Sequence, residues 1–207
     1  MKISGAISHP PLHQGCDCYI EGRAGDGEQK PDGNEPAFTP PVLKKIESDA
    51  IKEWIGVKDS SLSFDDFRTG NSEKAKALRK LTLLKGDPIL KSPHFRGITL
   101  TDAQIFDLDT KKIMSLNKIS SFSRTEKLAD QWAGGVSRMA QSIGIKDARK
   151  VLIEVTEGLK HGIDIAPYAE ALAGQKETLT GGSLKILKIN KKQDGSVFIS
   201  AKHVYEK

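Results

Sequence analysis

The order of hydrophobic and polar positions predicts helices early in the chain, after residue 38, and strands later. Apolar residues recur every three or four positions in two stretches: Leu43, Ile46, Ala50, Trp54 and Ile55, then Ala75, Leu78, Leu81 and Leu84. That spacing is typical of one face of a helix. We expect the first helix to begin with Thr39 as its N-cap and Pro40 in its first turn, and the second near Ser72. The stretch "SFDDF" between them suits a short helical turn.

From residue 93 the pattern changes. The alternating stretches "HFRGITL" and "KISSFS" predict strands, and "TDAQIFDL" between them predicts a short helix. The stretch "TEKLADQWAGGVSRMAQSI" predicts a longer helix. Its apolar face would hold Leu128, Trp132, Val136 and Met139. The clearest strand is "KVLIEVTEG", which alternates in the sense expected for a sheet.

The last third contains a short helical piece at "PYAEALA" and two strands, "LKILKI" and "SVFISAKHV". The connection "NKKQDG" between these strands suits a hairpin. Helices therefore come first and strands follow, without regular alternation of strand and helix. This order predicts an α+β fold rather than a doubly wound one.

Residues 1–38 are rich in Gly, Pro, Asp and Glu, so they bury too little apolar surface to offset the entropy of ordering. We expect a disordered segment there, and a candidate secretion signal. One domain would follow over residues 39–207, with a helical part at 39–90 and a sheet core at 91–207. Cys16 and Cys18 lie in the first segment as two free thiols, a weak indication of a reducing compartment.

Composition narrows the function classes. No apolar run approaches the ~20 residues of a membrane span, and the N-terminus lacks the apolar region of a classical signal peptide. The net charge is +5, while residues 1–39 hold three Lys/Arg against six Asp/Glu, so the rest of the chain is basic. "KILKINKK" carries four lysines without interleaved aromatics, which favours a solvated strand over a nucleic-acid surface. We expect a monomer without membrane or nucleic-acid partners.

Common site motifs are missing from the sequence. It has no GxGxxG after a strand, no GxxxxGK[ST], no GxSxG and no HExxH, and its five histidines lack metal-ligand spacing. We therefore expect no metal site, no Rossmann site and no P-loop.

Three local features could carry chemistry. Arg96 lies between apolar neighbours on a predicted strand, where it forms either a structural ion pair or an anion clamp. Ser121 and Ser123 flank Phe122 at a strand end, and structural hydroxyls are the simpler interpretation. Gln175 and Glu177 point the same way if their segment is extended, although a surface turn is the simpler interpretation.

Taken together and in order, these stretches resemble the arginine–serine–glutamate class of ADP-ribosyltransferases. "FRG" at 95–97 resembles the arginine strand, and "SFSRTEKLA" resembles a Ser-Thr-Ser motif followed by a helix, with Phe122 in place of the threonine. The "VLIEV" strand, "GIDI" at 162–165 and Gln175-Lys176-Glu177, a Gln-x-Glu motif, follow in the family's order. The resemblance covers about residues 93–190.

The resemblance implies a fold of two antiparallel sheets packed as a sandwich, with helices to one side and NAD, the substrate, between the sheets. Phe95, Arg96 and Gly97 would line the NAD site with Ser123, and Arg96 would hold the diphosphate or ribose. Ser121 would orient the nicotinamide ribose and Glu177, and Glu177 would contact the ribose 2′-hydroxyl as nicotinamide leaves. A carboxylate there stabilises the positive charge of an oxocarbenium-like transition state.

Gln175 bears on the acceptor, because an amide cannot act as a base near neutral pH. We expect transfer to a neutral side chain, Asn, Thr or Gln rather than Arg. The arrangement resembles bacterial virulence effectors secreted into the host cell cytoplasm, with ubiquitin or a small GTPase as the host target. Two alternatives remain open: an NAD glycohydrolase, and a non-catalytic binding module whose site has degenerated, as the Phe122 departure would allow.

Overall fold

The computed structural model describes residues 39–56, 62, 64–116, 119–168 and 176–204. The N-terminal helices are α1 (Lys45–Trp54), α2 (Phe64–Thr69) and α3 (Glu73–Leu81). Two further helices, α4 (Asp102–Lys111) and α5 (Glu126–Ser142), lie among the strands, and short 3-10 turns occur at η1 (Pro88–Lys91) and η2 (Ala166–Tyr168). The strands are β1 (His94–Leu100), β2 (Ile113–Ser115), β3 (Ser120–Ser123), β4 (Arg149–Val155), β5 (Ile163–Asp164), β6 (Glu177–Thr180), β7 (Ser183–Lys191) and β8 (Val197–Val204).

The start of the second predicted helix is confirmed, and that of the first is wrong. The Ser72 side chain accepts a hydrogen bond from the Ala75 N–H at the start of α3. However, α1 is capped by Lys44 rather than Thr39, and the Glu47 carboxylate accepts the Lys44 backbone N–H at 2.8 Å. Pro41 explains the delay, because a residue that precedes proline is disfavoured from helical backbone angles, and here that residue is Pro40.

The strands form one eight-stranded mixed sheet in the order β2-β7-β8-β4-β1-β3-β6-β5. β4 and β8 run parallel, and the other neighbours run antiparallel. The α+β class with N-terminal helices is confirmed, but the expected pair of antiparallel sheets is not what the hydrogen bonding shows. The ladder is continuous because Phe95 on β1 pairs with Ser123 on β3.

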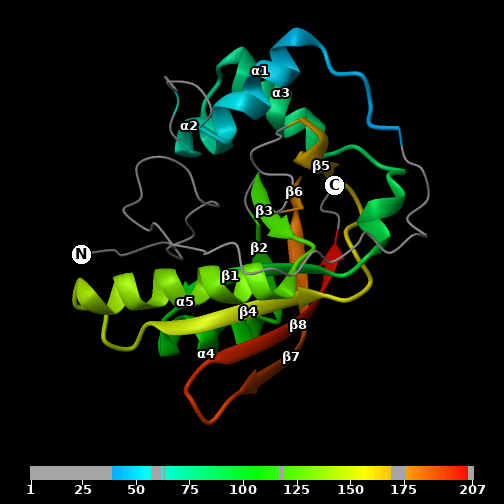
Figure 1. The fold of residues 1–207 in the computed structure, drawn as a ribbon. Helices are drawn as coiled ribbons and strands as arrows, with labels where there is room; N and C mark the ends of the chain where they lie inside the picture. The colour runs from blue at the N-terminus through cyan, green and yellow to red at the C-terminus, as the bar shows by residue number, and fades with distance from the viewer. Residues whose placement is uncertain (1–38, 57–61, 63, 117–118, 169–175, 205–207) are drawn as a thin grey trace, which may run out of the picture.

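That junction is nonetheless narrow. β1 pairs with β4 along seven residues, whereas its register with β3 consists of the pair Phe95–Ser123. Figure 1 shows β3 and β6 running steeply across the direction of β1, β4 and β8. The sheet therefore has a five-stranded part and a three-stranded part that diverge beyond Phe95.

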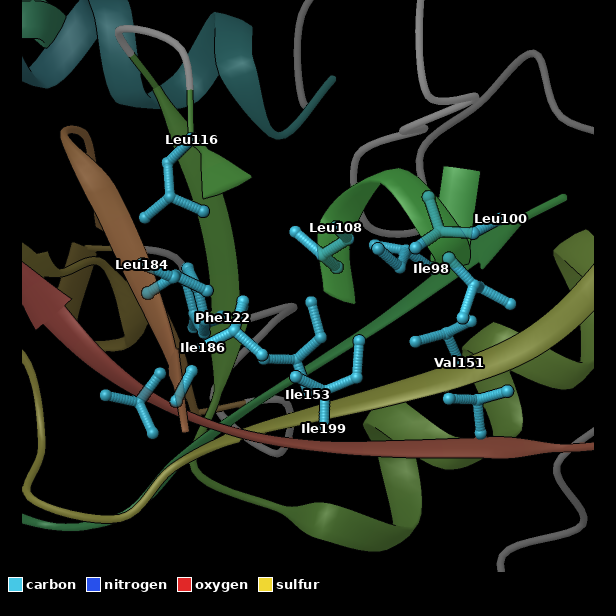
Figure 2. Close-up of a cluster of buried hydrophobic side chains, with 14 of the residues drawn as sticks. Ile98, Leu100, Leu108, Leu116, Phe122, Val151, Ile153, Leu184, Ile186 and Ile199 are labelled. Atoms are coloured by element: carbon cyan, nitrogen blue, oxygen red, sulfur yellow. The ribbon is translucent and has the colours of Figure 1, made fainter. Parts of the chain in front are cut away.

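Two apolar cores follow this division. One fills the face of the five-stranded part that α4 covers, and Figure 2 shows Ile98, Val151, Ile153, Ile186 and Ile199 meeting there. The other joins the helices α1 to α3 to the three-stranded part, where Trp54 and Phe67 share a cluster with Ile119, Ile163 and Leu179. The N-terminal helices thus cover the face of β6 that carries Leu179.

Helix α5 packs on β1 and β4 through small residues. Its buried positions are Ala129, Ala133, Val136, Ser137 and Ala140. Of the face that the sequence predicted, Val136 is buried, whereas Leu128, Trp132 and Met139 are only partly buried. The small face is required because the helix approaches β1 closely at Gly97, where a Cβ atom would lie 1.9 Å from the Ala129 carbonyl oxygen.

Candidate active site

Glu177 begins β6, directly opposite Ser123 on β3. Residues opposite each other in an antiparallel pair share a face, and residues two apart on a strand do so as well. Ser121 and Leu179 therefore point to the same side as Glu177, toward the N-terminal helices. The structure thereby brings together Ser121 and Glu177, which are 56 positions apart in the sequence.

Arg96 reaches this place from β1. Its Nη1 donates a hydrogen bond of 2.6 Å to the Ser121 carbonyl oxygen, beside the point where β1 and β3 separate. Its guanidinium also lies over the Phe122 ring, 5.7 Å from the ring centroid. Burial and the nearby charge of Arg68 lower the pKa of Arg96 to about 10, while Glu177 acts in the opposite direction. The side chain therefore remains charged at neutral pH.

Glu177 is a buried carboxyl group, 2% exposed. Its Oε1 accepts a hydrogen bond from the indole Nε1 of Trp54 at 3.3 Å, and its Oε2 is buried without a hydrogen-bond partner among the described residues. Burial raises the pKa of Glu177 to about 7, although Ser121, Trp54 and Arg96 each act to lower it. A carboxyl group that titrates near neutral pH suits a catalytic task.

A second arginine, Arg68 on α2, lies close enough to Arg96 to lower the Arg96 pKa. Its Nε donates to the Ile119 carbonyl oxygen at 3.3 Å, so both arginines approach backbone carbonyls at the start of β3. Arg79 of α3 fixes α2, because it donates to the carbonyls of Phe67 and Gly70 at 2.7 Å each. Two neighbouring buried guanidinium groups, of which Arg96 also acts on Glu177, favour the binding of an anion.

The remaining predicted residues lie around this centre. Phe95 is partly buried and lies on the same face of β1 as Gly97, opposite to Arg96. Gly97 has no side chain, which allows α5 to pack closely against β1. Ser123, the last residue of β3, shapes the turn before α5, since its Oγ accepts the Thr125 N–H at 3.0 Å. Gln175 lies outside the described residues.

Phe122 is the residue that departs from the family pattern. It is buried in the core of Figure 2 and points away from Ser121, on the opposite face of β3. Its ring packs against the Arg96 guanidinium. Phenylalanine in place of the threonine of the family motif therefore does not alter the face of β3 that carries Ser121.

The "GIDI" stretch contributes an ion pair beside the site. Asp164 on β5 receives Arg124 Nη2 at 3.0 Å, and both side chains are at most 10% exposed. Asp164 also accepts the Ala166 N–H at 3.1 Å, which shapes the turn after β5. Its negative charge helps to raise the pKa of Glu177.

Sequence reasoning missed Trp54, Arg68 and Arg124 as site residues. Trp54 was assigned to a helix core, which it does join, but its N–H faces a carboxylate 123 positions away. The indole N–H of a buried tryptophan usually has a hydrogen-bond partner, so a tryptophan expected in a core could have been expected to contact a polar group. For Arg68, the signal was a cation next to the buried Phe67 in a short helix.

Two further properties concern only the described part of the chain. No helix there is long and apolar enough to cross a membrane. Within those same residues, no cluster of three or more His, Cys, Asp or Glu side chains is arranged to hold a metal ion.

Comparison with known proteins shows what this fold is similar to. No protein-family model matches the chain, and no curated protein sequence matches it significantly. Among solved structures, it is similar to the Vis toxin, an ADP-ribosyltransferase from Vibrio splendidus, with 14% identity and a TM-score of 0.52 over 79% of this chain and 75% of Vis. The Vis complex with agmatine aligns at 16% identity and a TM-score of 0.52, over 82% of this chain and 79% of Vis. The chain therefore has an α+β fold similar to that of an ADP-ribosyltransferase toxin.

Proposed function

We propose that this chain is a mono-ADP-ribosyltransferase of the arginine–serine–glutamate class, which transfers ADP-ribose from NAD to a neutral side chain of a host protein. Residues 39–207 form its catalytic domain, with helices at 39–90 and the sheet at 91–207. Residues 1–38 precede this domain as a segment for delivery into host cells. The fold similarity to Vis supports the enzyme class, and the site residues support the chemistry.

The observation that carries the proposal is the meeting of Arg96, Ser121 and Glu177 at one point of the sheet. Arg96 binds the Ser121 carbonyl, and both Ser121 and Arg96 act on the Glu177 carboxyl group. These are the three residues expected from the order of motifs along the chain. Their meeting at the junction of the two parts of the sheet is hard to reconcile with unrelated structural roles.

The chemistry follows from these groups. Breaking the bond between nicotinamide and ribose leaves the bonding electron pair on the pyridine nitrogen and a positive charge on the ribose carbon and ring oxygen. An ionised Glu177 stabilises this charge more than it stabilises the neutral ribose hydroxyls of the ground state. The acceptor then forms a bond to the ribose carbon, and its proton leaves to solvent.

Arg96 and Arg68 would hold the diphosphate of NAD. Both are charged and largely buried, at 7% and 9% exposed, and each already donates to a carbonyl of the β3 segment. A guanidinium fork has further N–H groups that can bind phosphate oxygens. Each diphosphate oxygen bound would also relieve the repulsion between the two cations.

The acceptor is inferred from Gln175, since an amide can orient a neutral acceptor but cannot deprotonate an arginine. We assign Asn, Thr or Gln as the acceptor residue and ubiquitin or a small GTPase as the host protein. Phe122, the residue that departs from the family motif, is buried and packs against the Arg96 guanidinium. Because it helps to hold Arg96 in place, its presence argues against a degenerate binding module.

The test is incubation of the protein with NAD and a eukaryotic lysate, followed by nicotinamide assay and peptide mass spectrometry. Glu177→Gln should abolish both nicotinamide release and the adduct, whereas Glu157→Gln, at a half-exposed glutamate paired with Lys202, should leave both unchanged. An adduct on arginine would overturn the assignment of Gln175. Release of nicotinamide without any protein adduct would identify a glycohydrolase, and no consumption of NAD would overturn the proposal.

A further inference from the structure

The two oxygens of the Glu177 carboxylate have different surroundings. Oε1 accepts the Trp54 indole N–H, whereas Oε2 is buried and has no hydrogen-bond partner among the described residues. A buried acceptor without a partner loses its hydration without compensation, so it usually marks a functional position or a missing ligand. The Ser121 hydroxyl acts on the carboxyl group but does not complete a hydrogen bond to Oε2.

The indole of Trp54 is held rigidly enough to orient this carboxylate. Trp54 is the last residue of α1 and is 1% exposed. Its ring meets the Phe67 ring edge to face, with centroids 5.9 Å apart and planes at 78°. The preceding residue, Glu53, forms an ion pair with Lys74, which ties this end of α1 to α3. Rotation of the indole would have to disturb its packing against Phe67, and the ion pair limits movement of the helix end that carries it.

We propose that Trp54 is a positioning residue, whose indole N–H fixes Oε1 of Glu177 and so presents Oε2 to a ribose hydroxyl of NAD. This inference rests on the proposed transferase function. A carboxylate with one oxygen held cannot turn both oxygens toward Arg96, so one acceptor remains for the substrate. The ribose hydroxyl would supply the donor that Oε2 lacks.

The helices α1 to α3 thereby take part in the chemistry as well as covering the sheet. The donor comes from the N-terminal helices, the carboxylate from β6 and the counter-charge from β1. Removing the donor should affect the reaction more than binding, because the charge that Glu177 stabilises appears in the transition state. We expect kcat to fall about 10- to 100-fold, with KM for NAD changed less than about threefold.

The experiment compares three variants of the full chain. Trp54→Phe removes the N–H and shrinks the ring. Replacement of Trp54 by the isosteric amino acid benzothienylalanine removes only the N–H, so it tests the donor even if the phenylalanine variant folds poorly. Phe67→Leu is the comparison variant, since it loosens the packing around Trp54 but retains the donor. For each variant, kcat and KM for NAD are measured, and the Glu177 carboxyl carbon is titrated by NMR without NAD.

Both variants that lack the N–H should lower kcat and raise the Glu177 pKa, because the Trp54 hydrogen bond acts to lower that pKa. Phe67→Leu keeps the donor but loosens its support, so it should change both quantities less than either variant that lacks the N–H. An unchanged kcat with the isostere would overturn the positioning role, and a raised kcat would show that the indole blocks the site instead. The titration requires no NAD, so it can be read even if the wild type proves inactive. In that case, a Glu177 pKa that is higher in the variants than in the wild type would confirm the Trp54 contact although the transferase proposal had failed.

Discussion

Arg96 Nη1 lies 2.6 Å from the carbonyl oxygen of Ser121, and this contact bridges β1 and β3 beside their junction at Phe95 and Ser123. A guanidinium at this position can make two kinds of contact. It hydrogen-bonds to β3 beyond the point where β3 pairs with β1, and it still has N–H donors for an anion. The structural and functional interpretations of Arg96 are therefore compatible.

Arg96→Lys tests this dual role. A lysine has a compact charge without a planar fork, so it cannot bind both the Ser121 carbonyl and a phosphate in the same geometry. We expect kcat/KM for NAD to fall about 10- to 100-fold, mostly through KM, when measured as initial rates of nicotinamide release. Arg149→Lys, at an exposed pair with Asp102, is the control and should have no effect. An equal loss in both variants would exclude a specific role for the Arg96 fork.

The pH dependence of activity should follow ionisation of Glu177. Its pKa is raised to about 7, chiefly by burial, and only the ionised form stabilises a developing positive charge. We expect kcat/KM to fall as pH drops below about 7, by about tenfold per unit well below the pKa. The measurement is the rate of nicotinamide release at low NAD concentration across the pH range. A rate that stays level to about pH 5 would show that the reaction does not depend on ionisation of Glu177.

The same raised pKa predicts that Glu177 destabilises the fold at alkaline pH. The folded carboxyl has a pKa of about 7 against a model-peptide value of 4.5, so the folded state retains a proton that the unfolded state has lost. Stability from this group is present at low pH and is lost as pH rises through about 7. Glu177→Gln should therefore increase the free energy of unfolding near pH 8, by up to about 3 kcal/mol, and change it little near pH 5. Urea unfolding at both pH values measures this, and a destabilised variant at pH 8 would contradict it.

Much of the fold could be predicted because local patterns report local structure. Strands such as β1 and β4 alternate in the sequence, and Ser72 is a strong N-cap, so these elements were found. The face of α5 was mistaken because hydrophobicity favours Leu128 and Trp132, whereas close approach to Gly97 selects small residues. β2 was missed because three residues are too few to show a period. β6 was missed because all four of its residues are buried although three of them are polar, so hydrophobicity does not mark it as a strand.

The site divides in the same way. Arg96, Ser121 and Glu177 could be proposed from the order of motifs along the chain. Trp54 and Arg68 could not, because their contacts with the sheet join segments 123 and 51 positions apart and depend on how the helices pack on Leu179 and Ile119. Nothing in the local sequence of α1 or α2 specifies that packing.

The close approach of α5 to β1 predicts opposite effects for two glycine substitutions. In Gly97→Ala the new Cβ would lie 1.9 Å from the Ala129 carbonyl oxygen and 2.7 Å from the Ala133 nitrogen, so helix and strand must separate. We expect a loss of at least about 3 kcal/mol in the free energy of unfolding. Gly135→Ala, within α5, meets no atom within 4 Å and should stabilise by up to about 1 kcal/mol. Chemical denaturation of both variants measures this, and a tolerated Gly97→Ala would show that α5 can shift at little cost.

Buried histidines should make the fold sensitive to acid. Burial lowers the pKa of His94 and of His203 to about 4, from 6.5. The neutral form of His203 is fixed by its partners, since Nδ1 accepts the Lys160 N–H at 2.9 Å while Nε2 donates to the Gly181 carbonyl at 2.7 Å. Protonation of Nδ1 would break the first bond and place a charge beside the His161 ring, whose centroid is 4.6 Å away.

Between pH values of about 6.5 and 4, the unfolded chain therefore binds about two protons that the folded chain does not. The contribution of these two histidines to the free energy of unfolding is complete above pH 6.5 and declines as the pH falls toward 4. His203→Gln should lower stability at neutral pH but reduce the steepness of the acid decline by about one proton, measured as the free energy of unfolding at several pH values. Ser142→Ala, at an exposed residue of α5 that does not titrate, serves as the control and should leave the steepness unchanged. If His203→Gln declines as steeply as the wild type, the acid sensitivity arises from groups other than this histidine.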